Sequence, residues 1–78
     1  MDITDEILKN DKYKKLVDRL STKTLKLIAE DHLRALQEAH KGIKKEEPER
    51  LNDLEYLQAM ADGMQILAKT VLGKRSKK

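Results

Sequence analysis

Two long segments of this 78-residue chain repeat apolar residues at the spacing of an α-helix, and this repetition constrains the fold most. In residues 22–41 and again in residues 48–72, the apolar side chains fall on one helical face about 160° wide. The chain holds only three glycines and one proline, a composition that favours helices over strands. We therefore predict an all-α protein.

Residues that commonly begin or end helices lie at the borders of these segments. Ser21 precedes the first segment as a candidate N-cap, and Gly42 follows it as a candidate C-cap. Pro48 suits the first position of the second helix, and Gly73 follows its last residue. The connector between them is short enough to fold residues 22–41 and 48–72 into a long antiparallel helical hairpin.

The first twenty residues do not fit one helix, because the apolar residues before Asn10 face differently from those after Asp11. We predict two short helices, at residues 3–9 and 12–20, with Asp11 as the N-cap of the second. Together with the hairpin they make a three- to four-helix bundle, a single domain over residues 1–73. Residues 74–78 contain nothing apolar and are expected to form a disordered basic tail.

The net charge of +3 comes from 17 basic and 14 acidic residues, and the tail alone contributes four of the basic ones. A second basic cluster lies in residues 9–26, where three cations align on one helical face. Such clusters can bind phosphate groups without reading a base sequence. The candidate nucleic-acid contacts are Lys12, Lys15, Arg19, Lys74, Arg75, Lys77 and Lys78.

Several classes of protein are disfavoured by what the sequence lacks. It has no cysteine for disulfides or thiolate metal sites, and no run of about 20 apolar residues that could span a membrane. Its acidic first residues do not resemble a secretory signal, so we expect a cytoplasmic protein. Glycine-rich phosphate loops and nucleophile motifs are also missing. We expect no enzymatic activity, no cofactor, no membrane association and no small-molecule substrate.

The two histidines are the residues closest to a chemical role. His32 and His40 lie eight positions apart, about 12 Å along a helix, which is too far for one metal ion. We predict no metal site. His32 falls near the centre of the apolar face and is expected to be packed and neutral, with a pH-sensitive contact as the alternative.

The favoured function is a small helical interaction module, such as a regulator, inhibitor or assembly factor. Its wide apolar faces suggest burial against another protein or a second copy of itself, and flexible methionines suit such surfaces. Gly63 could mark a close helix contact, although a tolerated helical glycine is the preferred interpretation. The alternative function is a nucleic-acid-binding accessory protein. The candidate protein-interface residues are Tyr56, Met60, Met64, Leu67 and Val71.

Overall fold

The computed structural model describes residues 3–77, which form five α-helices and one short 3₁₀ helix without any strand. This confirms the all-α prediction. No helix within these residues is long and apolar enough to cross a membrane. The elements in chain order are α1 (Ile3–Lys9), α2 (Asp11–Asp18), α3 (Thr22–Glu30), α4 (His32–Glu46), η1 (Pro48–Arg50) and α5 (Leu54–Ser76).

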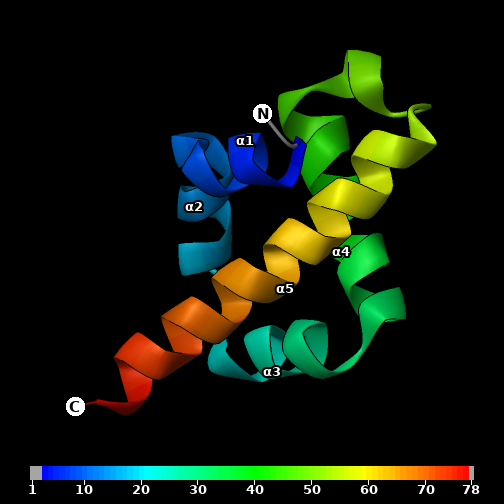
Figure 1. Cartoon of the computed structure of the whole chain (residues 1–78). Coiled ribbons are helices and arrows are strands. Elements are labelled where there is room, and N and C mark those ends of the chain that lie inside the picture. The colour runs from blue at the N-terminus through cyan, green and yellow to red at the C-terminus, as the bar shows by residue number, and fades with distance from the viewer. Residues whose placement is uncertain (1–2, 78) are drawn as a thin grey trace.

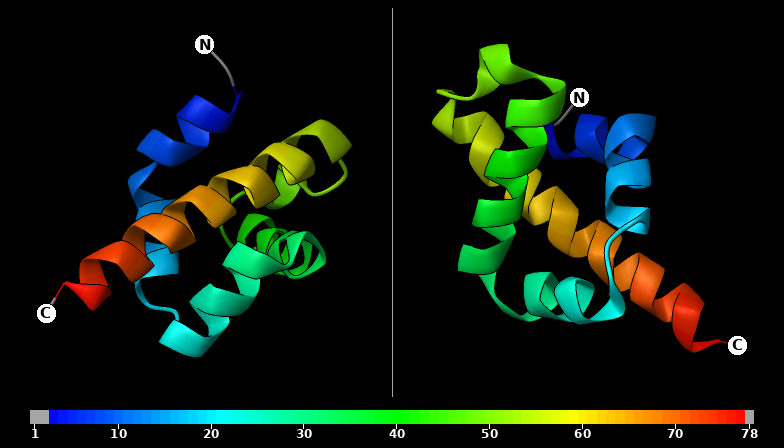
Figure 2. Two further views of the ribbon diagram at one scale, coloured as in Figure 1. Left: turned by 60° about the horizontal axis from the view of Figure 1, so that its bottom comes forward. Right: turned by 180° about the vertical axis from the view of Figure 1, so that it is seen from behind.

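Helix α5 is the element around which the others are arranged. It crosses the molecule diagonally in Figure 1 and packs against each of the other four α-helices. Seen from behind, α2, α3 and α4 lie on three sides of α5 (Figure 2). Its apolar face is therefore covered by several elements of this chain, and Met60, Ala61, Met64 and Ala68 are buried.

The predicted helix over residues 22–41 is interrupted at Asp31, which corrects the hairpin prediction. Asp31 adopts an extended conformation, with φ −129° and ψ 109°. Its N–H donates to the carbonyl of Leu27 at the end of α3, and its carboxylate accepts from the N–H of Leu33. Aspartate is a strong N-capping residue, so this one side chain starts α4 in a new direction. The break also changes which residues face the core, and leaves Leu33 exposed.

The second helix of the expected hairpin also has different bounds. Gly42 does not end a helix but lies buried inside α4, which continues to Glu46. Helical geometry is disfavoured for a residue that precedes proline, and Glu47 accordingly leaves the helix before Pro48. Pro48 then begins η1, whereas α5 starts six residues later with Asp53 as its N-cap.

The two ends of the chain fit the sequence pattern to different degrees. Two short helices occupy the N-terminal region as expected, but Asn10, and not Asp11, caps the second through the N–H of Lys12. At the other end, α5 extends through Ser76, so residues 74–76 are helical where a disordered tail was predicted. Lys78 lies outside the described residues.

Gly63 marks a close contact between α1 and α5, which corrects the interpretation of a merely tolerated glycine. A Cβ atom built on Gly63 would lie 2.9 Å from Cγ2 of Ile7. That methyl group is bonded directly to the Cβ of a buried, β-branched residue and cannot swing aside. The missing side chain therefore sets how closely α1 approaches α5. Gly73, near the end of the same helix, has no such neighbour within 4 Å.

Replacing these two glycines by alanine should have opposite effects on stability. Gly73→Ala gains helix propensity in open space and should raise the free energy of unfolding by up to about 1 kcal/mol. Gly63→Ala makes the same gain but must push Ile7 outward, an overpacking cost of about 1–3 kcal/mol. Urea unfolding of both variants measures the difference. Equal stabilisation by both would contradict the close contact.

Candidate binding groove between α2 and α5

A surface groove runs between α2 and the C-terminal part of α5. Its volume is about 470 Å³, which lies within the range of ordinary ligand and peptide pockets. Leu67 and Val71 are half-buried and pack against the core, so they form a fixed apolar floor. We call this site the α2–α5 groove, and it is lined by Lys14, Lys15, Asp18, Leu67, Thr70, Val71 and Lys74.

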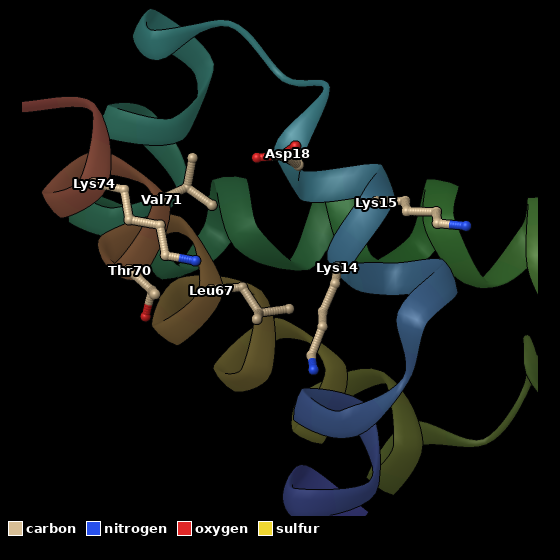
Figure 3. A pocket seen from close by; sticks show the side chains of 7 residues that line it. All are labelled: Lys14, Lys15, Asp18, Leu67, Thr70, Val71 and Lys74. Carbon is tan, nitrogen blue, oxygen red and sulfur yellow. The ribbon is translucent and has the colours of Figure 1, made fainter.

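The charged side chains of the groove stand around its apolar floor. In Figure 3, Leu67 and Val71 lie between Lys74 of α5 and Lys14 of α2. Asp18 faces Val71 from the end of α2, whereas the ammonium group of Lys15 points away from the floor (Figure 3). The groove thus combines apolar surface with two flanking cations and one carboxylate.

The lysines of this region are not neutralised by the protein. Within residues 3–77, the ion pairs are His32–Asp62, Glu38–Lys41 and Glu47–Arg50, none of which involves a groove lysine. The opposite side of α2 is similar: Lys12, Lys15 and Arg19 border a smaller hollow against Lys45 and Glu46 of α4. Since these lysines are not paired with carboxylates of the same chain, both sides of α2 favour anionic partners, with an attraction that salt weakens.

The predicted protein-interface residues fall into two groups. Tyr56, Met60 and Met64 are buried within this chain, so no partner reaches them in this fold. Their assignment as contact residues is corrected for that reason: the apolar face of α5 is covered by four helices. Leu67 and Val71 instead line the groove and keep part of their surface accessible.

The predicted nucleic-acid contacts are also divided by the structure. Lys12 and Lys15 are exposed on α2, Arg19 is exposed directly after it, and Lys74 flanks the groove. Lys77 is exposed after α5, and Lys78 is outside the described residues.

Arg75 is held by hydrogen bonds within the chain, whereas its assignment as a nucleic-acid contact stays a prediction. Its guanidinium donates to the hydroxyl of Thr22 and to the backbone carbonyls of Asp18 and Leu20, each at 3.0 Å. The carbonyls at a helix end lack intrahelical partners, and Arg75 satisfies that need at the end of α2. It thereby joins the end of α5 to the α2–α3 connection.

The two tyrosines, the only aromatic residues of the chain, meet inside the protein. The hydroxyls of Tyr13 and Tyr56 lie 3.3 Å apart, and the residues are 0% and 4% exposed. Burial raises the pKa of both, and the nearby charge of Glu47 raises them further. Arg50 pairs with Glu47 at 3.2 Å and lies over the ring of Tyr56. Neither ring is available for stacking on a base.

The histidines do not lie where the sequence pattern predicted. His32 is 50% exposed at the start of α4, because the break at Asp31 turns it away from the core. Its Nδ1 lies 3.2 Å from Oε1 of Gln65 and 3.8 Å from the carboxylate of Asp62. His40 is exposed. Across residues 3–77, no three acidic or histidine side chains are grouped as a metal site would require.

Sequence reasoning missed the groove as a site, although it selected four of its residues. Lys15 and Lys74 were assigned to nucleic acid, whereas Leu67 and Val71 were assigned to protein; the fold brings all four together. Lys14 was missed because no local pattern shows that α5 lies beside α2. The chain matches none of the protein-family models, curated proteins or solved structures with which it was compared.

Proposed function

We propose that this protein is a non-enzymatic interaction module that binds an acidic, partly apolar segment of another protein in the α2–α5 groove. The observation that carries the proposal is the pairing of a half-buried apolar floor with unneutralised lysines at its borders. An accessory role as a regulator, inhibitor or assembly factor in the cytoplasm belongs to the same proposal.

Two features of the groove favour a protein segment over a nucleic-acid strand. A phosphate backbone would use the lysines but would leave Leu67 and Val71 without a partner, whereas an apolar side chain would cover them. Single-stranded nucleic acid is commonly held by stacking on aromatic rings, and here both tyrosines are buried. A segment with leucine-like and acidic side chains can cover the apolar floor of the groove and pair with its flanking lysines.

A second candidate function is binding of duplex nucleic acid along α2. It is favoured by the unpaired cations Lys12, Lys15, Arg19 and Lys45, which lie around one hollow and outnumber its one carboxylate, Glu46. Such binding would depend on phosphates alone and would fall steeply with added salt.

Titration of ¹⁵N-labelled protein with a synthetic amphipathic peptide of leucine and glutamate tests the proposal. We expect chemical-shift changes at the backbone amides of Leu67, Val71 and Lys14. Val71→Glu should weaken binding about tenfold, because it replaces an apolar contact by a repelling charge. Ile66→Glu is the matched control on the solvent side of α5, where the side chain is 45% exposed, and should bind as the wild type does.

Three further results decide between the candidates. A control peptide in which serine replaces each leucine should bind much more weakly, since it retains only the charges. Equal binding of both peptides, or no shifts in the groove, would contradict the proposed function. Tight, salt-sensitive binding of duplex DNA that is lost in the double variant Lys12→Glu/Arg19→Glu would favour the second candidate.

A further inference from the structure

The end of the molecule opposite the groove carries a complementary surface. Leu54, the first residue of α5, is 71% exposed, the most exposed large apolar side chain described. Glu49, Asp53 and Glu55 lie within five residues of it in sequence, are exposed, and take part in no ion pair within residues 3–77, while the carboxylate of Asp53 also accepts the N–H of Tyr56 as the N-cap of α5. We call Leu54 with these three carboxylates the Leu54 end.

The groove and the Leu54 end are complementary both in apolar surface and in charge. The groove offers an apolar floor between Lys14 and Lys74, and the Leu54 end offers one exposed apolar side chain with three exposed carboxylates close to it in sequence. Asp18 is the exception, since it adds one negative charge beside Val71. Three unpaired carboxylates facing groove lysines still leave a net attraction between the two surfaces.

These two surfaces cannot meet within one molecule. Leu54 and Leu67 lie on the same straight helix, thirteen residues or about 20 Å apart along its axis. Figure 1 shows the two ends of α5 at opposite sides of the molecule. The match can be used only between two copies.

We propose that the α2–α5 groove takes the Leu54 end of a second copy of this chain. The inference rests on the proposed function of the groove and names its occupant. Leu54 packs on Leu67 and Val71, and its neighbouring carboxylates face Lys14 and Lys74. Because a pair joined in this way keeps a free Leu54 end on one copy and a free groove on the other, the contact is head-to-tail and can close into rings or extend into growing chains.

Sedimentation velocity over a range of protein concentrations tests this arrangement. The small contact predicts weak association, so the wild-type protein should grow beyond a monomer as its concentration approaches about 1 mM, and added salt should reverse the growth. Leu54→Gln removes the apolar anchor, and Lys14→Glu/Lys74→Glu reverses the charge of the groove. Each variant should remain a monomer. Ile66→Gln is the matched control, and should associate as the wild type does.

Mixing the two defective variants gives the sharpest result. The Leu54→Gln chain keeps an intact groove, and the Lys14→Glu/Lys74→Glu chain keeps an intact Leu54 end. Their mixture should therefore form a one-to-one dimer that does not grow. A wild-type protein that stays monomeric at about 1 mM, or a mixture that forms no dimer, would overturn the inference. Titration of Leu54→Gln with the amphipathic peptide separates this inference from the proposed function of the groove. If the peptide binds but the wild-type protein does not self-associate, only the inference that a second copy occupies the groove is refuted.

Discussion

Above pH 10 we expect the protein to lose stability steeply as the pH rises. Tyr13 and Tyr56 are buried with their hydroxyls 3.3 Å apart. Burial raises the pKa of both above the usual value of about 10, and in Tyr13 the hydrogen bond to Tyr56 adds to the effect. The folded protein therefore keeps protons that the unfolded chain releases in alkaline solution.

The sign and size of this effect follow from proton linkage. Below pH 10 both states keep their tyrosine protons, so the full stability is present. Above pH 10 the unfolded chain ionises first, and the free energy of unfolding falls by about 1.4 kcal/mol per pH unit for each protonated buried tyrosine. Two tyrosines thus remove up to about 2.7 kcal/mol per unit, a large part of the stability of so small a domain.

Urea unfolding from pH 8 to pH 11, followed by circular dichroism, measures this dependence. Tyrosinate absorbance reports the same event directly, because the chain has no other aromatic residue. The double variant Tyr13→Phe/Tyr56→Phe serves as the control and should show a much flatter profile above pH 10. Tyrosines that ionise near pH 10 in the folded wild type would contradict the prediction.

The substitution Met60→Ala should lower the free energy of unfolding by about 2–5 kcal/mol, as deletion of a fully buried methionine commonly does. Its side chain reaches toward Gly42 of α4, where its terminal methyl group lies 3.5 Å from the position a Cβ would take. Removing it leaves a cavity between α4 and α5 that neither helix can fill without losing other contacts.

Val71→Ala is the matched control for this prediction. Val71 lies on the same helix but is half-buried at the groove, so its truncation should cost about 1 kcal/mol or less. Thermal or urea unfolding at low protein concentration measures both variants. Similar small losses in the two variants would contradict the role of Met60 as a tightly packed core residue.

The sequence predicted the helical class and most of the core-facing residues, because both depend on local periodicity. Met60, Met64, Ala61 and Ala68 fall on one helical face, and the structure buries all four. What covers that face does not depend on local pattern. An apolar stripe has the same appearance whether a second chain or a neighbouring helix packs on it, and the assignment of Met60 and Met64 to an interface failed for this reason.

The break at Asp31 shows where local pattern misled. The apolar residues on both sides of Asp31 keep the spacing of one continuous helix, so the sequence predicts a single helix over residues 22–41. The capping carboxylate of Asp31 allows two helices, and packing against α5 selects them. One change of direction then moved His32 and Leu33 from the expected core to the surface.

The sequence by itself determined that the chain is helical and where its basic residues and apolar faces lie, since backbone propensity and periodicity are local properties. Only the tertiary structure decided that Lys14 of α2 and Lys74 of α5 stand on either side of Leu67 and Val71. Lys14 lies more than fifty positions from the other three residues, and no local interaction joins it to them. The docking of α2 against α5 brings them together, because that docking buries Tyr13 and Val17 in the core.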